Sequence, residues 1–262
     1  FSIIGLLPGK IGATSKVMEV ANIERFALKI FKPEFCGIKD LDENEKFDFD
    51  KIKQIYKEYE IVSIFNHPNI IKCHGLCTGD SIHTPSILFE YCPSNLKKKI
   101  KRLSKLECAT ILIEICSAMK EVHKANIIFC DLKLENILLD KDGHAKLSDF
   151  GSALGKGEEY SKEKIEGSLM YMAPELFNEN PHFNETIDVY SYGVVYYMIV
   201  TKGEYPMIRI ADTTNWKKPE IPNYFTQFSR DLINKCWSLD PSNRPSFDTI
   251  YSQLLQNQSN IV

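Results

Sequence analysis

The chain has 262 residues, of which 44% are hydrophobic and 26% are charged. This length and composition allow one large domain or two small lobes with separate hydrophobic cores, and they exclude a mostly disordered chain. The formal net charge is −3, so the overall charge does not indicate binding to nucleic acid or to an anionic membrane.

The eight cysteines are spread along the chain, with no CxxC pair and no zinc-ligand spacing. Most of them are expected to be small buried side chains, and an intracellular, reducing compartment is expected for the chain. The longest apolar run, Tyr192–Val200, is far too short to span a bilayer. We therefore expect a cytoplasmic domain that has no membrane segment and belongs to a longer chain.

Short strands joined by a glycine-containing turn are predicted for Phe1–Phe31, in which Phe26-Ala27-Leu28-Lys29-Ile30-Phe31 alternates about Lys29. Cys36–Asp48 is polar and acidic without a period, and it predicts a surface insertion. A helix is predicted from Phe49 onward, because apolar residues recur at the spacing of one helix face: Ile52, Ile55, Tyr59 and Val62.

Two further strands are expected around Ile70–Cys77 and Ser86–Tyr91, and Pro93 then interrupts the pattern. Helical patterns dominate beyond this break, at Leu106–His123, Thr186–Val200 and Phe228–Trp237. The sequence thus predicts an α+β fold with a β-rich N-lobe (1–91), a hinge (90–94) and an α-rich C-lobe (95–262).

Two loops carry the residues with the clearest chemistry, Asp131-Leu132-Lys133-Leu134-Glu135-Asn136 and Asp149-Phe150-Gly151. Phosphoryl transfer needs a divalent metal, for which Asn136 and Asp149 are candidates, and a carboxylate such as Asp131 to orient the attacking hydroxyl. Lys133 is placed to steady the same phosphate. The alternative is a simple turn, because Asp and Asn favour turns for their own hydrogen-bonding reasons.

These loops resemble the catalytic and metal-binding loops of eukaryotic protein kinases. The resemblance covers nearly the whole chain, and it implies a bilobal kinase fold over residues 1–262 with ATP and Mg²⁺ as cofactors. The family's His-Arg-Asp triplet reads Phe129-Cys130-Asp131 here. The Asp is kept, whereas the His and Arg are missing.

The segment Gly9–Val17 occupies the place of the family's GxGxxGxV phosphate-binding loop. Only its middle glycine is kept, since Lys10 and Ser15 replace the outer two. A plain hairpin turn is therefore an alternative. The resemblance implies nucleotide contacts from Leu7, Gly9, Lys10, Ile11, Gly12 and Val17.

Lys29, in Ala27-Leu28-Lys29, is similar to the strand lysine that contacts the α and β phosphates in the family. The resemblance implies that its partner is Glu58, because Glu58 precedes His67-Pro68-Asn69-Ile70 by the family's interval. A buried lysine needs such a counter-charge. Glu60 is close enough to confuse this register, and a solvated helix acid is the alternative for Glu58.

Leu88-Phe89-Glu90-Tyr91-Cys92 resembles the family's strand end and hinge. The resemblance implies a gatekeeper role for Phe89 and adenine pairing by the backbones of Glu90 and Cys92. It also implies that Val17, Ala27 and Leu138 sandwich the adenine ring.

Lys133 and Ser168 are similar to residues that distinguish serine/threonine-directed kinases, because a lysine beside the catalytic Asp is typical of that class. The resemblance also implies that Glu175 of Ala173-Pro174-Glu175 pairs with Arg244, and that Asp188 caps backbone amides of the catalytic loop. Asp188-Val189-Tyr190-Ser191-Tyr192-Gly193 and Cys236–Pro245 together indicate the tyrosine kinase-like group.

A basic cluster follows the hinge: Lys97, Lys98, Lys99, Lys101 and Arg102. Such runs are usually solvated helix faces, and docking of an acidic substrate is the alternative.

The resemblance predicts an ATP-dependent serine/threonine protein kinase whose partner is a protein substrate, with no role in nucleic-acid binding. Two alternatives remain. The degraded glycine loop and Phe129-Cys130 favour a pseudokinase that serves as a nucleotide-binding or scaffold module. A small-molecule phosphotransferase shares the phosphate chemistry but should lack the pairing of Glu175 with Arg244. The sequence does not indicate an oligomeric state.

Overall fold

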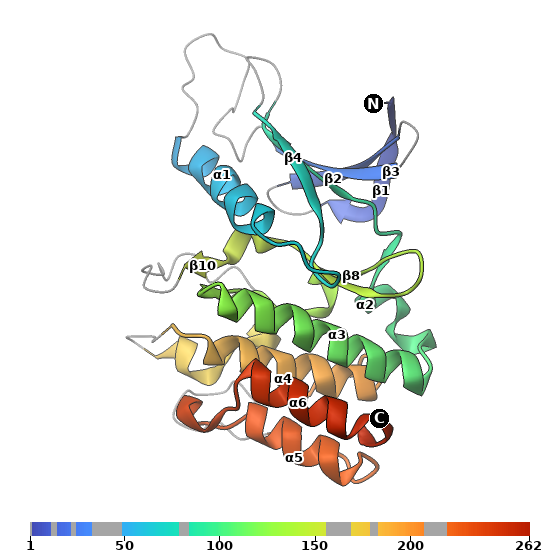
Figure 1. The fold of residues 1–262 in the computed structure, drawn as a ribbon, viewed down its shortest axis with the longest axis vertical. Helices are drawn as coiled ribbons and strands as arrows, with labels where there is room; N and C mark the ends of the chain where they lie inside the picture. The colour runs from blue at the N-terminus through green and yellow to red at the C-terminus, as the bar shows by residue number, and fades with distance from the viewer. Residues whose placement is uncertain are drawn as a thin grey trace. The chain divides into compact units, whose positions relative to one another are not determined.

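The computed structural model describes residues 2–11, 15–21, 25–32, 49–78, 84–155, 169–178, 183–206 and 219–262. The chain forms two compact units. Unit 1 contains Phe1–Pro93 and Asp149–Gly151, and unit 2 contains Ser94–Ser148 and Ser152–Val262. Strands dominate the first unit and helices the second (Figure 1), which confirms the predicted α+β class.

Unit 1 is built on a five-stranded antiparallel sheet with the order β1-β2-β3-β5-β4. Its strands are β1 (Ser2–Ile11), β2 (Ser15–Ala21), β3 (Arg25–Phe31), β4 (Cys73–Cys77) and β5 (Ser86–Glu90). Along β3, Ala27, Lys29 and Phe31 are buried, as the alternation in the sequence predicts. Lys29 is therefore placed on the buried face of a central strand, between β2 and β5.

Helix α1 (Phe49–Ser63) begins where the sequence predicts it and packs beside β4 (Figure 1). Its buried face carries Ile55, Glu58 and Val62, whereas Glu60 is exposed. This periodicity decides which acid faces the sheet. The expected surface insertion, Cys36–Asp48, lies outside the described residues.

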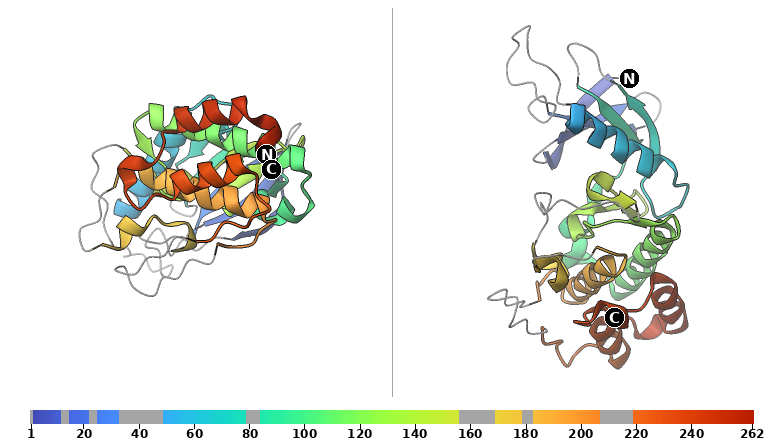
Figure 2. Two further views of the ribbon diagram at one scale, coloured as in Figure 1. Left: turned by 90° about the horizontal axis from the view of Figure 1, so that it is seen from below. Right: turned by 90° about the vertical axis from the view of Figure 1, so that its left-hand side faces the viewer.

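Four long helices form the core of unit 2, and Figures 1 and 2 show them side by side. They are α3 (Lys105–Lys124), α4 (Thr186–Val200), α5 (Gln227–Cys236) and α6 (Phe247–Gln256). α3 packs against α6, and α4 packs against α5. Ser104 and Glu107 form a capping box that starts α3, and Ser246 caps α6, a helix for which the apolar spacing had given no bounds.

Short strands hold the loops of unit 2 in place. β6 (Ser94–Asn95), β8 (Ile137–Leu139) and β9 (Ala145–Leu147) form one sheet, and β7 (Ile127–Ile128) pairs with β10 (Leu154–Gly155). The segment between β7 and β8 contains Asp131, Lys133 and Asn136. Two strands therefore fix both ends of the loop that carries the predicted catalytic residues.

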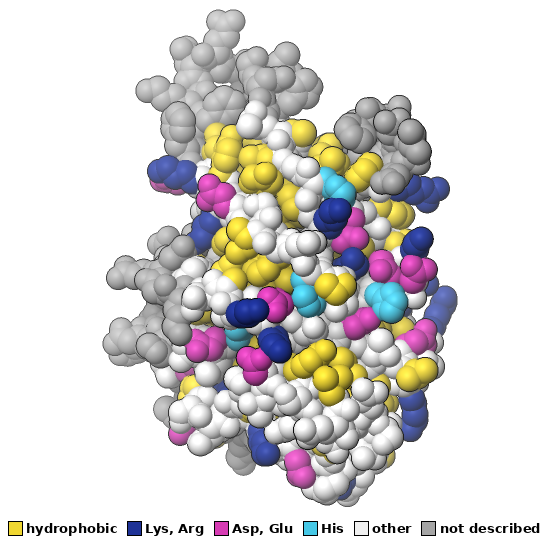
Figure 3. Space-filling model, in the orientation of Figure 1, with side chains coloured by type: hydrophobic (Ala, Val, Ile, Leu, Met, Phe, Trp, Pro, Cys, Tyr) yellow, Lys and Arg dark blue, Asp and Glu magenta, His cyan; other side chains and the backbone are white. Residues whose placement is uncertain are grey.

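The described surface has mixed charge. On the face drawn in Figure 3, basic and acidic side chains are interspersed, without a broad area of one sign. Within the described ranges, each helix is too short or too polar to cross a bilayer.

Candidate active site

Lys29 lies between two carboxylates within unit 1. Its ammonium donates to Glu58 Oε1 at 2.6 Å, to Glu58 Oε2 at 2.9 Å and to Asp149 Oδ1 at 2.8 Å. Lys29 and Glu58 are buried, whereas the Asp149 side chain is 49% exposed. The expected contact of Lys29 with Glu58 is thus present. No pattern in the sequence around Lys29 predicts its contact with Asp149.

The opposite charges of this cluster change the pKa values of Lys29 and Glu58. Burial alone would lower the pKa of Lys29, but the charges of Asp149 and Glu58 outweigh it, so the pKa of Lys29 is raised. Burial raises the pKa of Glu58, and the charge of Lys29 opposes that shift. Lys29 therefore stays a cation at neutral pH, as a group that binds phosphate must.

Gly151 allows the backbone of this loop to approach Glu58 closely. A Cβ at Gly151 would lie 3.2 Å from Glu58 Oε2 and 3.6 Å from Asp149 Oδ1. Asp149 itself has a left-handed backbone, with φ of 68°. A side chain at position 151 would therefore press on the Glu58 carboxylate, and glycine avoids this contact.

The second cluster belongs to unit 2 and surrounds Asp131. Lys133 Nζ donates to Asp131 Oδ2 at 2.6 Å. Asn136 Nδ2 donates to the Asp131 carbonyl at 2.9 Å and to Asp131 Oδ2 at 2.8 Å. Ser148 donates through its amide and its hydroxyl to the Asn136 carbonyl, at 2.9 Å in both cases. The three predicted catalytic residues are therefore in direct contact.

Asp188 holds the backbone directly before Asp131 in place. Its side chain is fully buried and accepts hydrogen bonds from the amides of Phe129 and Cys130, both at 2.8 Å. His123 Nε2 lies 2.8 Å from the same carboxylate. The expected capping by Asp188 is present, whereas the contribution of His123 is evident only from the structure.

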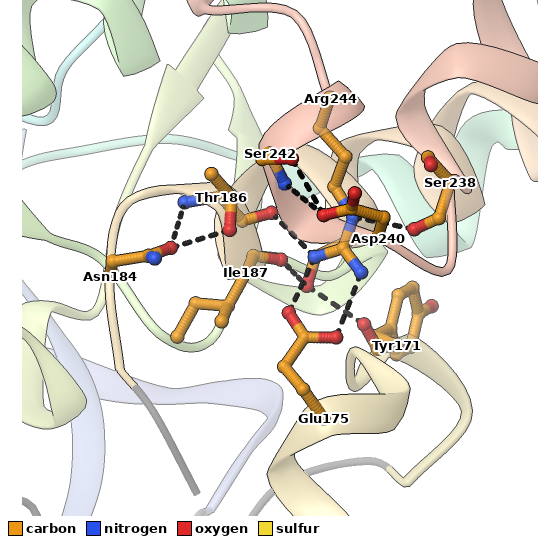
Figure 4. Close-up of polar contacts among 10 residues, drawn as sticks. Tyr171, Glu175, Asn184, Thr186, Ile187, Ser238, Asp240, Ser242 and Arg244 are labelled. Carbon is orange, nitrogen blue, oxygen red and sulfur yellow. Dashed lines mark hydrogen bonds and ion pairs between the residues drawn. The ribbon is translucent and has the colours of Figure 1, made fainter.

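Arg244 and Glu175 form a planar bidentate pair (Figure 4). Nη1 lies 2.5 Å from Glu175 Oε1, and Nη2 lies 2.8 Å from Oε2. Arg244 also donates to the carbonyls of Thr186 and Ser238, and its guanidinium lies 5.2 Å from the ring centroid of Tyr190. The pair therefore ties the segment before α4 to the segment before α6, as the sequence predicts.

The oxygen atoms available here suit a hard cation such as Mg²⁺. Mg²⁺ in phosphoryl-transfer sites is bound by one or two protein oxygens together with phosphates and water. Asp149 supplies a half-exposed carboxylate, and Asn136 turns its amide nitrogen toward Asp131, which leaves its amide oxygen outside those bonds. The described ranges contain no group of three or more His, Cys, Asp or Glu side chains that could hold a metal ion. Asp149 belongs to unit 1 and Asn136 to unit 2, and each offers a hard oxygen donor of the kind that Mg²⁺ prefers.

The other predicted nucleotide-binding residues lie on several elements. Leu7, Gly9, Lys10 and Ile11 belong to β1, Val17 to β2 and Ala27 to the buried face of β3, while Leu138 belongs to β8 of unit 2. Gly12 and Ser168 lie outside the described residues. β1 and β2 lose regular register between Leu6 and Ile11.

Glu90 ends β5 and Cys92 follows it. The Glu90 amide donates to the Lys72 carbonyl at 2.9 Å, and the Glu90 side chain accepts from the Lys72 amide at 2.8 Å. These bonds fix the Glu90 backbone at the end of the strand. A role in adenine pairing stays a prediction for both residues.

The comparisons agree with this geometry. The family model for the protein kinase domain matches residues 3–256. A probable serine/threonine-protein kinase of Dictyostelium discoideum is 32% identical over 83% of this chain and 25% of its own length. The dual specificity protein kinase shkD of the same organism is 31% identical over 80% of the chain and 30% of its own length.

An Aurora kinase of Saccharomyces cerevisiae is 29% identical over 80% of this chain and 58% of its own length. The chain thus spans about a quarter to a third of the two Dictyostelium relatives and more than half of the yeast one. It belongs to the protein kinase family, and its fold is the bilobal α+β kinase fold.

Proposed function

We propose that this domain transfers the γ-phosphoryl group of ATP to a serine or threonine hydroxyl of a protein substrate. The observation that carries the proposal is the buried Lys29 ammonium held between Glu58 and Asp149. A buried cation with a half-exposed carboxylate beside it suits polyphosphate and metal binding better than a purely structural role.

Each residue has a defined task in this reaction. Lys29 binds phosphate oxygens of ATP, and Asp131 accepts a hydrogen bond from the substrate hydroxyl and orients it. As the hydroxyl oxygen bonds to the γ-phosphorus, the bond to the ADP oxygen breaks and the hydroxyl proton passes to the Asp131 carboxylate. Lys133, 2.6 Å from Asp131, balances the negative charge beside the transferred group. Asn136 and Asp149 are the residues that would hold Mg²⁺, which would supply neutralisation of the phosphate charge.

The finer assignment rests on residues and on relatives. Lys133 beside Asp131 supports serine/threonine specificity, and the D. discoideum relative that is 32% identical over 83% of this chain is named a probable serine/threonine-protein kinase. The segments Asp188–Gly193 and Cys236–Pro245 support membership of the tyrosine kinase-like group. The scattered cysteines support an intracellular location.

The missing His and Arg before Asp131 do not disturb the loop. Asp188 binds the amides of Phe129 and Cys130, which are backbone groups and do not depend on the side chains at those positions. The Asp131 cluster thus forms without them, which supports catalysis over a purely scaffolding role.

The test is direct. The purified protein is incubated with labelled ATP, Mg²⁺ and a generic basic protein, beside an Asp131→Asn control. Label on serine and threonine in the wild type and none with the control supports the proposal. Mainly phosphotyrosine would refute the specificity, and no transfer by the wild type would indicate a pseudokinase.

A further inference from the structure

Lys202 carries its ammonium from the end of α4 to a buried thiol near the start of α3. Lys202 Nζ donates to Cys108 Sγ at 3.1 Å and to the Leu103 carbonyl at 2.7 Å. Cys108 is fully buried, and Lys202 is half-buried. The two residues are 94 positions apart, so their contact depends on the folded chain. A sulfur and a nitrogen that can both act as nucleophiles therefore lie in direct contact.

The backbone of Lys202 holds its side chain in this direction. Its φ is 58°, in the left-handed region that a residue just after a helix often adopts and that glycine usually occupies. The turn is fixed by the amides of Thr201 and Gly203, which donate to the carbonyls of Tyr197 at 2.9 Å and Met198 at 2.7 Å. The fixed turn limits the positions that the Lys202 ammonium can reach.

This contact lies at one end of the helix pair formed by α3 and α4, which run side by side in unit 2 (Figure 1). In the middle of the pair, the Tyr192 hydroxyl donates to the Leu112 carbonyl at 2.9 Å. At the other end, His123 Nε2 lies 2.8 Å from Asp188 Oδ2. A covalent bond at the first contact would therefore join the two helices whose opposite ends hold the catalytic loop.

We propose that Cys108 and Lys202 form a redox-sensitive modification site, at which hydrogen peroxide converts their hydrogen bond into a covalent sulfur–nitrogen cross-link between α3 and α4. The inference goes beyond the proposed kinase function and does not depend on it. Peroxide is small and uncharged, and the first turn of α3 beside Cys108, residues 104–107, is exposed. The oxidant therefore has only a short distance to travel from solvent to the thiol.

The chemistry takes two steps. In the first, peroxide oxidises the Cys108 sulfur to a sulfenic acid: the O–O bond breaks, an S–O bond forms and the second oxygen leaves as water with the thiol proton. In the second, the Lys202 nitrogen loses one proton to solvent and attacks the sulfur. An S–N bond forms, the S–O bond breaks, and the oxygen leaves as water with a further proton from the nitrogen. Sulfenic acids condense with backbone nitrogen in the same way.

The product has a defined composition. The cross-linked protein lacks two hydrogen atoms compared with the reduced protein, and it gains no oxygen. A thiol reductant such as dithiothreitol should restore the thiol of Cys108 and the amine of Lys202 while it is itself oxidised to a disulfide.

The experiment treats the reduced, folded protein with hydrogen peroxide and analyses tryptic peptides by tandem mass spectrometry. We expect two peptides joined through Cys108 and Lys202, no cleavage after Lys202, and loss of the joined product in dithiothreitol. Oxidation of Cys77, which is exposed, reports that peroxide has acted. The Tm should rise by about 5–10 °C on oxidation, because the bond closes a long loop of the chain.

Two variants test the assignment. Lys202→Arg keeps a cation that can donate to the Leu103 carbonyl, but a guanidinium stays protonated and is a poor nucleophile. It should give no joined peptides and no rise in Tm. The matched control is Cys116→Ala, which removes another fully buried thiol of α3, one that donates to the Phe247 carbonyl at 3.5 Å. This variant should keep both the cross-link and the rise in Tm on oxidation.

Three results would each overturn the proposal. The first is the absence of joined peptides from a protein whose Cys77 is oxidised. The second is an equal yield of joined peptides from protein unfolded in urea, since the cross-link would then not depend on the folded contact. The third is an equal rise in Tm for Lys202→Arg, which would assign the stabilisation to another oxidised group.

Discussion

Asp188 holds the backbone of Cys130, the residue directly before Asp131, in a left-handed conformation. The Cys130 amide donates to Asp188 Oδ1 at 2.8 Å, and its φ is 67°. This region of backbone conformation is unfavourable for residues other than glycine and needs support from the surroundings. The buried carboxylate supplies that support, which explains how the loop keeps its shape with phenylalanine and cysteine before Asp131.

We predict that Asp188→Asn lowers both stability and activity. Asparagine has one acceptor oxygen instead of two, so one of the amides of Phe129 and Cys130 is left buried without its bond, at about 1–3 kcal/mol. Urea unfolding measures the stability, and the rate of peptide phosphorylation measures the effect on Asp131. Asp248→Asn is the control, because Asp248 is 73% exposed and pairs with Lys120 at the surface. Equal losses in the two variants would contradict the special role of Asp188.

The sequence predicts most elements of the fold because their signals are local. α4 has the predicted bounds, Thr186–Val200, because most of its residues are apolar and the run 194–200 is uninterrupted. Lys29 and Glu58 could be paired because the resemblance supplies the interval from Glu58 to His67, and the structure then places both side chains on buried faces. The contact of Lys29 with Asp149 and that of Lys97 with Glu135 could not be predicted in the same way, because each joins segments whose approach depends on the tertiary fold.

We predict that Arg244→Lys destabilises the protein although the charge is kept. Lysine cannot reproduce the two parallel bonds to Glu175 and the bonds to the carbonyls of Thr186 and Ser238. The expected loss in the free energy of unfolding is about 3 kcal/mol. Arg244 is buried, and the lysine would not replace all the hydrogen bonds that Glu175 accepts from it. Thermal or urea unfolding measures it. A loss below about 0.5 kcal/mol, as is usual for surface substitutions, would show that the fork geometry is unimportant.

We predict a pH-dependent contribution from His144, which lies 2.6 Å from Glu114. The hydrogen bond from His144 to Glu114, with the charge of that carboxylate, raises the pKa of His144 above 6.5. A raised folded-state pKa gives stability that is fully present below the unfolded value and is lost as the pH rises through the folded value.

The free energy of unfolding of the wild type should therefore exceed that of His144→Gln most clearly below pH 6.5. The difference should stay below about 1 kcal/mol, because the side chain is 57% exposed and screened by solvent. Urea titrations across the pH range measure it. The control repeats this comparison in proteins that also carry Glu114→Gln. A pH dependence that persists in those proteins would assign the effect to a group other than the His144 and Glu114 pair.

The last prediction concerns the ion pair of Lys29 and Glu58, whose loss should lower both stability and activity. Lys29→Met leaves a carboxylate that is 3% exposed without its cation, so a loss of about 3–5 kcal/mol is expected. Lys29→Met/Glu58→Met should recover much of that stability, because no uncompensated charge stays buried. Neither variant should phosphorylate substrate, because the phosphate-binding cation is gone. Urea unfolding of these two variants, of Glu58→Met and of the wild type gives the coupling energy of the pair.

The pH dependence separates this explanation from a simple packing defect. With Lys29 absent, burial and Asp149 both raise the pKa of Glu58, so the folded state binds a proton more tightly than the unfolded state. The stability lost in Lys29→Met should therefore shrink as the pH falls and Glu58 is protonated. Lys53→Met is the matched control, because Lys53 pairs with Asp50 at 3.2 Å and both are exposed. A loss in Lys29→Met that is independent of pH would show that the missing side-chain volume, and not the buried charge, destabilises the protein.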